Sequence, residues 1–167
     1  MKVVKSGAKC LKVFKNSLKK TGKEAKTMLS GEFRHSIDPK NRLFIPAKHR
    51  EELGDTFMVV RSIRENCLQV YSSEEWESYI APIRKMERRD SERILRTLHR
   101  NAAQVSPDSQ GRIVLPPSLI EHASIVKGAV VVGCGAYAEI WAEEVYDAKL
   151  LEEDLDDIRA TLESFGL

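Results

Sequence analysis

Asp38-Pro39-Lys40-Asn41-Arg42-Leu43-Phe44-Ile45-Pro46 is followed 70 residues later by Asp108-Ser109-Gln110-Gly111-Arg112-Ile113-Val114-Leu115-Pro116. Both runs fit the pattern Asp-x-x-[Asn/Gly]-Arg, followed by three apolar residues and a proline. Further residues match at the same offset: Val70-Tyr71 with Ile140-Trp141, and Trp76 with Tyr146. Chance rarely aligns Asp, Arg, Pro and aromatic residues at one spacing, so we infer a duplicated unit. The middle of each unit aligns less well and calls for a gap.

Each motif predicts a tight turn that leads into a strand. Asn41 and Gly111 are residue types that tolerate a positive φ, and each stands between polar turn residues and an apolar run. Pro46 and Pro116 then suit the first turn of a short helix. The expected strands are Leu43–Ile45, Phe57–Arg61, Cys67–Tyr71, Ile113–Leu115, Ala129–Val132 and Glu139–Trp141. The expected short helices are Ala47–Leu53 and Pro117–Ala123.

The fold class expected from these elements is α+β. Neither unit alone holds enough strands to bury both faces of a sheet, but two interleaved units could close one small β-barrel with flanking helices. We expect five segments: a basic leader (1–27), a first repeat (28–75), a helical linker (76–104), a second repeat (105–146) and a C-terminal helix (147–167).

The flanking helices carry their own signals. Ser72-x-x-Glu75 is typical of a capping box, and Pro82 would kink or divide the helix that follows. The rest of the linker is rich in arginine, whereas a helix over about Glu143–Phe165 would place apolar residues at heptad spacing. Such a pattern needs a partner, either the linker helix or another subunit, and the acidic and basic helices match electrostatically.

Charge is distributed unevenly along the chain. The formal net charge is only +2, yet residues 1–27 carry nine Lys and one Glu, and residues 142–167 carry nine acids and two bases. The leader lacks the apolar core of a secretory signal peptide. It could form a basic amphipathic helix, but we expect a disordered tail or an upstream start codon with Met28 as the true beginning. Because the middle of the chain is nearly neutral, any affinity for nucleic acid must come from local patches.

Several classes of protein are disfavoured. No apolar run approaches the ~20 residues of a membrane span, and three cysteines without a CxxC pair favour a reducing, cytoplasmic compartment. The four histidines share no metal-ligand spacing. Residues 131–136 resemble the glycine-rich loop of cofactor-binding enzymes, but Glu139–Trp141 behind them looks like a strand where such a loop needs a helix. We therefore expect no enzyme activity, metal, cofactor or small-molecule substrate.

The chain resembles the MraZ family. The resemblance rests on Met28–Asp38, on Lys40-x-Arg42 with Ile45–Lys48, and in the second half on Asp108–Arg112, Leu115–Pro117 and Glu139–Trp141. It implies a pseudo-two-fold, swapped-hairpin barrel of two AbrB-type repeats. It also implies ring-like homo-oligomers in the cytoplasm, at the nucleoid, that bind direct repeats in double-stranded DNA upstream of the division and cell-wall gene cluster, mostly as a repressor. Asn41 departs from the glycine usual in the family, and we expect the turn to survive because Asn also tolerates the left-handed region.

The resemblance further implies that the Asp-x-x-x-Arg signature faces DNA. An arginine can read guanine with two donors or hold a phosphate, and a neighbouring aspartate can orient it or accept from cytosine. The region 34–50 is the more basic, so the first motif is the stronger candidate and the second could serve more as a structural partner. A plain structural ion pair is the alternative reading for either arginine. The candidate DNA-binding residues are Arg42, Asp38, Lys40, Arg34, Lys48, Arg112 and Asp108.

A protein-interaction module is the competing class. AbrB-type barrels also occur in antitoxins that bind a toxin through an extended tail, and the C-terminal heptad pattern could bind a foreign partner. The amphipathic end and the second barrel half argue against an antitoxin. A foreign protein that co-purifies in stoichiometric amount would favour one, whereas a self-assembled ring would favour the regulator.

Overall fold

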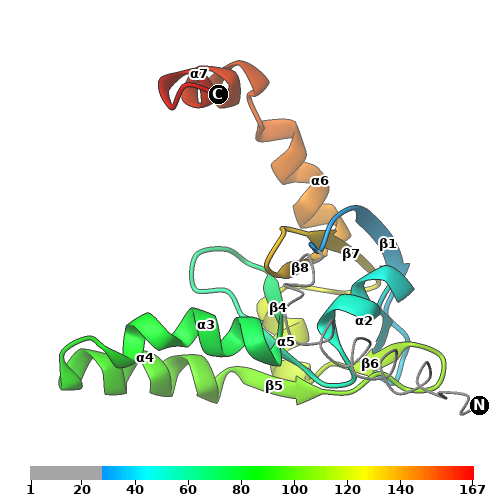
Figure 1. Ribbon diagram of the computed structural model, residues 1–167. Coiled ribbons are helices and arrows are strands. Elements are labelled where there is room, and N and C mark those ends of the chain that lie inside the picture. Colours follow the sequence, from blue (N-terminus) through cyan, green and yellow to red (C-terminus); the bar gives the residue numbers. More distant parts are fainter. Residues whose placement is uncertain (1–27) are drawn as a thin grey trace, which may run out of the picture.

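The computed structural model describes residues 28–167, so the expectations for residues 1–27 lie outside the described residues. The first half contains, in order, β1 (Glu32–Ser36), β2 (Arg42–Phe44), α2 (Ala47–Leu53), β3 (Phe57–Arg61), β4 (Leu68–Ser72), α3 (Ser73–Arg84) and α4 (Arg88–Arg100). The second half contains β5 (Ala102–Val105), β6 (Arg112–Val114), α5 (Pro117–His122), β7 (Gly128–Gly133), β8 (Ala138–Ala142), α6 (Glu143–Glu152) and α7 (Leu155–Ser164). The order of helices and strands is the same in both halves (Figure 1), and we call these halves the first and the second repeat.

The two repeats interleave in their sheets. One sheet has six strands in the order β1-β7-β8-β4-β3-β5, and the other is a two-stranded ribbon of β2 and β6. All pairs are antiparallel, and β1 pairs with β7 just as β5 pairs with β3. The ribbon is centred on Leu43 opposite Ile113, and the β4–β8 pair on Gln69 opposite Glu139. Exchanging the repeats therefore leaves the pairing scheme unchanged, as a pseudo-two-fold arrangement requires.

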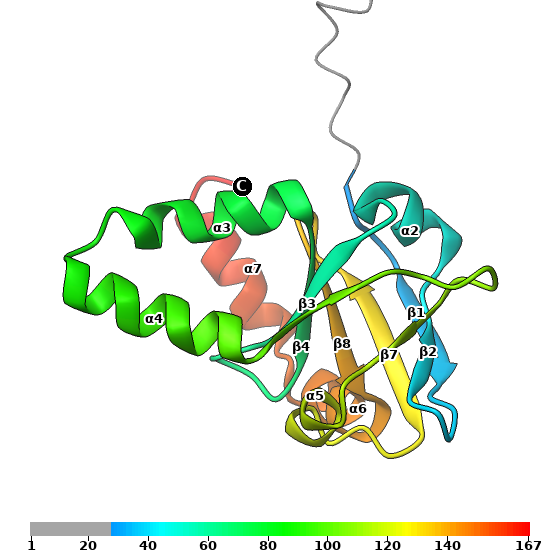
Figure 2. The ribbon, with the colours of Figure 1, turned by 90° about the horizontal axis from the view of Figure 1, so that it is seen from below.

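One core serves both repeats. Leu43 and Ile113, at the centre of the ribbon, are fully buried together with strand residues of the larger sheet such as Val70 and Ile140. Because the ribbon strands come from different repeats, neither repeat can bury its apolar face without the other. Figure 2 shows the strands gathered on one side, with α3 and α4 projecting from them.

The gap expected in the middle of the repeat is present. Strands β4 and β8 keep the offset of the turns, but Phe57 lies opposite Ser72 while Ala129 lies opposite Ala142. Strand β7 therefore comes two residues later than the offset alone would place it, and the extra residues lie in the connection between α5 and β7.

Most predicted elements are confirmed to within a residue or two, but β1 and β5 were missed. These strands form the two edges of the six-stranded sheet. Their sequences, EFRHS and AAQV, are polar or weak in β propensity. They become strands because β7 and β3 offer unpaired backbone groups at the sheet edges, which a local sequence pattern does not reveal.

The flanking helices differ from expectation in two ways. Pro82 does not divide the helix at its own position: it lies in the last turn of α3, which ends at Arg84. The single helix expected over 143–165 is wrong: α6 ends at Glu152, and the Asp154 side chain caps α7 by accepting from Asp156 N at 2.9 Å and Asp157 N at 3.4 Å. A capping residue satisfies the free N–H groups of a new helix, so it favours a start there over continuation. No helix within residues 28–167 has the length and apolar character to span a membrane.

Candidate nucleic-acid interface

The first turn is built around the Asp38 carboxylate. Its Oδ1 accepts from the backbone N–H groups of Lys40 and Arg42, both at 2.9 Å, and its Oδ2 accepts from Arg42 Nε at 2.7 Å. Asn41 occupies the left-handed region with φ of 60°, as expected for a turn that tolerates Asn in place of Gly. One carboxylate therefore shapes the turn and also holds the guanidinium of Arg42.

The second turn repeats this geometry. Asp108 Oδ1 accepts from Gln110 N and Arg112 N, both at 2.9 Å, and Gly111 takes a φ of 78°. Asp108 Oδ2 accepts from Arg112 Nε at 2.9 Å and from Arg112 Nη2 at 2.8 Å. The second arginine thus gives its aspartate two side-chain hydrogen bonds where the first gives one, which leaves Arg42 one more donor for another partner.

The two turns are joined across the repeats. Leu115 N donates to Asn41 O at 2.8 Å, and Ile45 N donates to Gly111 O at 2.9 Å. These bonds extend the β2–β6 ribbon by one step at each end. Each turn is therefore hydrogen-bonded to the end of the strand from the other repeat.

Both arginines lie on the outer side of the ribbon. Side chains alternate along a strand, and Leu43 and Ile113 point into the core, so their neighbours Arg42, Phe44, Arg112 and Val114 point outward. The side chains of Arg42 and Arg112 are 30% and 29% exposed, and Val114 is 58% exposed. We call this four-residue surface the ribbon face.

Both aspartates remain charged well into acid. Hydrogen bonds from Arg42 lower the pKa of Asp38, and those from Arg112 lower the pKa of Asp108 from 3.8 to about 2. At neutral pH each carboxylate is therefore ionised and holds its guanidinium through the hydrogen bonds described above.

The remaining candidate cations are spread over the first repeat. Lys40 is exposed in the first turn, and Lys48 on α2 donates from Nζ to Ser30 Oγ at 2.8 Å. Arg34 lies on β1, where it pairs with Glu32, Glu143 and Asp147 at 2.7–3.1 Å and its pKa is raised by these contacts. The structure thus brings Asp38, Lys40 and Arg42 together, but it attaches Arg34 to α6.

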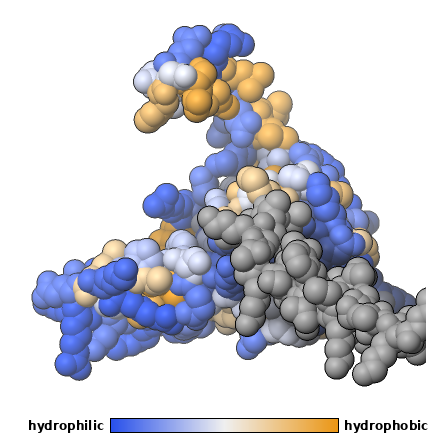
Figure 3. Space-filling view, in the orientation of Figure 1, coloured by the Kyte–Doolittle hydropathy of each residue, from blue (hydrophilic) through white to orange (hydrophobic). Residues whose placement is uncertain are grey.

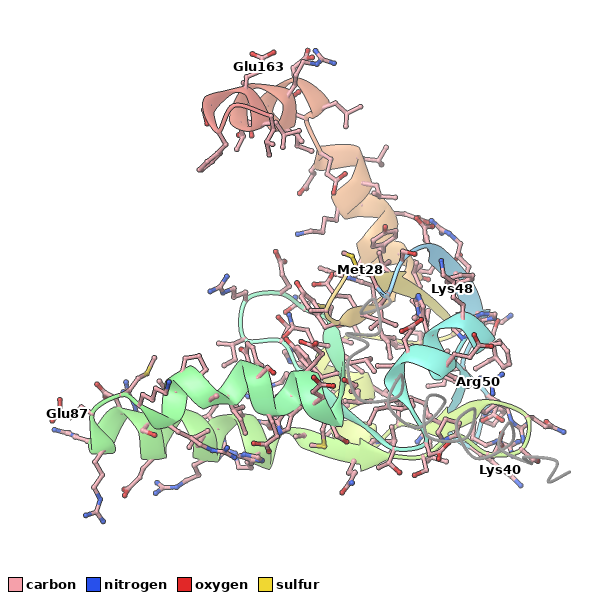
Figure 4. All side chains as sticks on the ribbon, in the orientation of Figure 1. Met28, Lys40, Lys48, Arg50, Glu87 and Glu163 are labelled. Atoms are coloured by element: carbon pink, nitrogen blue, oxygen red, sulfur yellow. The ribbon has the colours of Figure 1, made fainter. Side chains whose placement is uncertain are left out.

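Arg50, which ends the basic region 34–50, also lies at the ribbon. Its Nε donates to Ile45 O at 3.0 Å, and its guanidinium carbon lies 5.8 Å from the centre of the Phe44 ring. Figure 4 shows Arg50 and Lys40 on the side of the molecule opposite Glu87, which lies between α3 and α4. A Cβ on Gly111 of the other repeat would lie 2.8 Å from Arg50 Cζ. No sequence spacing signalled this approach, because it joins α2 to a turn of the other repeat.

The glycine-rich segment 131–136 has a packing role. Gly133 ends β7, and a Cβ there would collide with the backbone of Leu29 and Ser30, while Gly135 and Leu29 exchange backbone hydrogen bonds at 2.8 and 2.9 Å. Strand β8 follows the turn, as predicted, rather than a helix. Because Gly133 has no side chain, the segment before β1 can pack directly against its backbone. This arrangement is not that of a phosphate-binding loop.

The histidines and cysteines form no metal site within residues 28–167, where no group of three or more His, Cys, Asp or Glu side chains could hold an ion. His49 is fully buried, with Nε2 3.1 Å from Ser30 O and its ring edge-on to Phe33. Burial lowers its pKa, so it is a neutral packing residue.

The known proteins and the family model to which this chain is similar all carry one family name. A family model described as "MraZ protein, putative antitoxin-like" matches residues 28–97 and, a second time, residues 98–164. A protein of Ligilactobacillus salivarius named "Transcriptional regulator MraZ" is 40% identical over 144 residues, which covers 84% of this chain and all of the relative. Proteins of the same name from Desulforamulus reducens (41% over 122 residues, 72% of this chain and 85% of the relative) and Clostridium tetani (34% over 146 residues, 84% and 100%) are also similar.

Proposed function

The chain belongs to the MraZ family of transcriptional regulators, with two MraZ repeats, and from this premise we propose that it binds double-stranded DNA sequence-specifically through the ribbon face. It belongs to a family of regulators and not of enzymes, and its relatives are named transcriptional regulators. By the family resemblance, its targets are direct repeats upstream of the division and cell-wall gene cluster, where it acts mostly as a repressor. Its place of action is then the nucleoid within the cytoplasm.

The observation that carries the proposal is the pair of matched arginines on one two-stranded ribbon. The major groove of B-DNA admits a two-stranded β-ribbon, and arginine is the side chain that most often reads guanine there. Arg42 and Arg112 project from the same side of β2 and β6, and each is oriented by its own aspartate. A held guanidinium loses little conformational freedom on binding, so the aspartates favour recognition without touching DNA.

The other candidate cations fit a phosphate-binding role. Lys40 and Lys48 are exposed on the repeat that carries Arg42, so we assign them contacts with the DNA backbone that steer and position the ribbon. Arg34 would have to leave Glu32, Glu143 and Asp147 to reach DNA. Its predicted DNA contact is therefore the costliest of the set.

The fold supports a shared, symmetric binding unit. We propose that the six-stranded sheet and the ribbon, which share one core, together form the swapped-hairpin barrel that the resemblance implies. The support is the cross-repeat pairing of β1, β2 and β5, each of which pairs with a strand of the other repeat.

Substitution of the ribbon arginines tests the function. We expect Arg42→Ala to weaken binding to DNA from upstream of the protein's own gene by roughly tenfold or more, since a bidentate base contact contributes about 1–3 kcal/mol. Arg112→Ala is expected to have a smaller effect, because Arg112 is held by two side-chain bonds to Asp108. Fluorescence anisotropy with specific and scrambled duplexes gives both affinities. Arg64→Ala, which removes an exposed cation from the β3–β4 loop, is the control. Unchanged specific affinity in Arg42→Ala would refute the proposal.

Assembly would multiply these contacts. No residue of α6 or α7 is buried, and the apolar side of α7 is open, with Leu155 69%, Ile158 43%, Leu162 45% and Phe165 78% exposed. Figure 3 shows this apolar surface on the part of the molecule that stands apart from the sheets. Acidic residues flank it: Glu152, Glu153, Asp154, Asp156, Asp157 and Glu163.

The complementary surface is α4, whose exposed arginines are Arg88, Arg89, Arg93, Arg96 and Arg100. Since α7 and α4 lie in different repeats, pairing of α7 with α4 of a second copy makes a head-to-tail contact, and such contacts close into rings when the rotation permits. We therefore propose a ring-like homo-oligomer that places several ribbons on repeated DNA sites and gains avidity.

Light scattering coupled to gel filtration tests the assembly. Ile158→Asp introduces a charge on the apolar side of α7, so we expect smaller particles and weaker DNA binding with an unchanged circular dichroism spectrum. Thr161→Asp adds the same charge to an exposed position of the same helix and serves as the control. A foreign protein bound in stoichiometric amount to the parent chain, in place of self-association, would favour the antitoxin class.

A further inference from the structure

Arg50 connects the two repeats at one end of the ribbon. It belongs to α2 of the first repeat, yet its side chain turns back over the ribbon, where Nε donates to Ile45 O at 3.0 Å and the guanidinium lies over the Phe44 ring. The same Ile45 residue donates its N–H to Gly111 O at 2.9 Å. One residue, Ile45, thus links the Arg50 side chain to the second turn.

Gly111 shows how closely Arg50 approaches that turn. A Cβ built on Gly111 would lie 2.8 Å from both Cζ and Nε of Arg50 and 3.0 Å from Nη2. The guanidinium plane therefore rests against the Gly111 backbone, in the space that a side chain would take. Asp108 and Ser109 of the second turn line the same groove as Arg50.

This contact has no equivalent at the other end of the ribbon. The offset of 70 residues relates Arg50 to Ile120 on α5, and Gly111 to Asn41. Ile120 has no charge and no N–H in its side chain, so it cannot hold the first turn in this way. The first turn correspondingly contains Asn41 rather than glycine. The backbone pairing of the ribbon is therefore symmetric, but its side-chain contacts are not: an arginine lies against the second turn, and its counterpart at the first turn is an isoleucine.

We propose that Arg50 is a positioning residue for DNA binding: it fixes the second turn against α2 and so sets the placement of Arg112 relative to Arg42. The inference rests on the proposed function of the ribbon face and adds a third arginine to it. The planar shape of the guanidinium suits this place, because a flat group can lie against Gly111 while Nε donates to Ile45 O.

Amide hydrogen exchange of the full chain without DNA tests the contact itself. The ribbon supplies an internal control, because Ile45 N to Gly111 O and Leu115 N to Asn41 O are equivalent bonds in the two repeats and only the first lies beside Arg50. We expect Arg50→Ala to speed exchange of the Ile45 amide about fivefold more than that of Leu115. Equal changes at both amides would overturn the proposal.

DNA binding tests the consequence. We expect Arg50→Ala to reduce affinity for the specific duplex roughly threefold, no more than Arg112→Ala does, and affinity for a scrambled duplex much less, because misplacing Arg112 affects base readout more than phosphate attraction. Arg50→Lys keeps the charge but loses the planar contact, so it should behave like Arg50→Ala. Full specific affinity in Arg50→Lys would show that only charge matters and would overturn the positioning role. Arg64→Ala, which removes an exposed cation from the β3–β4 loop, away from the ribbon face, is the control for loss of one cation.

A double-mutant cycle connects the two arginines. If Arg50 acts through Arg112, the Arg50→Ala/Arg112→Ala chain should bind no more weakly than Arg112→Ala by itself, whereas additive losses would refute the link.

The proposed function and this inference fail in different ways. Undiminished binding by Arg42→Ala refutes the ribbon face as the DNA site, whereas loss of binding in Arg42→Ala with full binding in Arg50→Ala refutes only the role of Arg50.

Discussion

The helix pairs that end the two repeats follow the same order in the sequence but pack differently. In the first repeat, α3 and α4 pack on each other and on β3 and β5, around Trp76, Ile80 and Leu98, which are at most 4% exposed. In the second repeat, α6 contacts β7 and β8, while α7 stands apart (Figure 1). The two repeats thus end in equivalent helix pairs. The first pair, α3 and α4, packs into the fold, whereas α6 and α7 of the second pair contain no buried residue.

The matching aromatic residues of the two helix pairs make different contacts. Trp76 stacks with Tyr79 at 5.8 Å and meets His99 of α4 edge-on at 5.6 Å, so it holds the first pair of helices together. Its counterpart Tyr146 instead reaches β1, where its hydroxyl donates to Glu32 at 3.2 Å. Among the described residues, no ring contact joins α6 to α7 as Trp76 and His99 join α3 to α4.

Matched truncations of these two aromatic residues test the comparison most strongly. We expect Trp76→Ala to lower the free energy of unfolding by about 3–5 kcal/mol, because it opens a cavity in a packed cluster. Tyr146→Ala, at a half-buried position, should cost about 1 kcal/mol, mainly its hydroxyl contact. Urea titrations followed by circular dichroism give both values. Similar losses in the two variants would show that the second helix pair is as firmly packed as the first.

The two helix caps give a smaller test. Ser72 caps α3 by accepting from Glu75 N at 3.2 Å, and Asp154 caps α7. Removing a cap by substitution to Ala costs about 1 kcal/mol of helix stability. In Ser72→Ala we expect this loss in global unfolding, since α3 belongs to the core structure. In Asp154→Ala we expect faster amide exchange in α7 with an unchanged unfolding midpoint at concentrations where the chain is monomeric, and a shifted midpoint would argue against an independent α7.

The smallest expected effect concerns the acid response of the two turns. The pKa of Asp108 is lowered to about 2, so its pairing with Arg112 stabilises the fold above the ordinary aspartate pKa of 3.8 and is lost as the pH falls through about 2. Arg112→Ala should return the Asp108 pKa toward 3.8, as measured by a carbon NMR titration of the carboxyl group. The Asp38 titration should stay depressed in that variant, because its partner is Arg42. A shift of both aspartates together would mean that the turns are electrostatically coupled.

The sequence determined the features that depend on neighbours in the chain. The Asp-x-x-x-Arg turns, their left-handed residues Asn41 and Gly111, the strands that follow and the capping box at Ser72 all form through contacts within a few residues. Repetition of these signals also revealed the duplication and the interleaving of the two units. The proposed DNA face was predictable to the same extent, because its arginines lie inside the motif.

The tertiary structure alone decided the features that depend on distant partners. Strands β1 and β5 exist because β7 and β3 offer unpaired edges, and Arg50 reaches Gly111 only after the two repeats have interleaved. The break between α6 and α7 had a local signal in Asp154, but the loss of contact between α7 and the sheets did not. Local hydrogen bonds are encoded by short spacing along the chain, whereas packing against distant residues depends on the three-dimensional position of both partners.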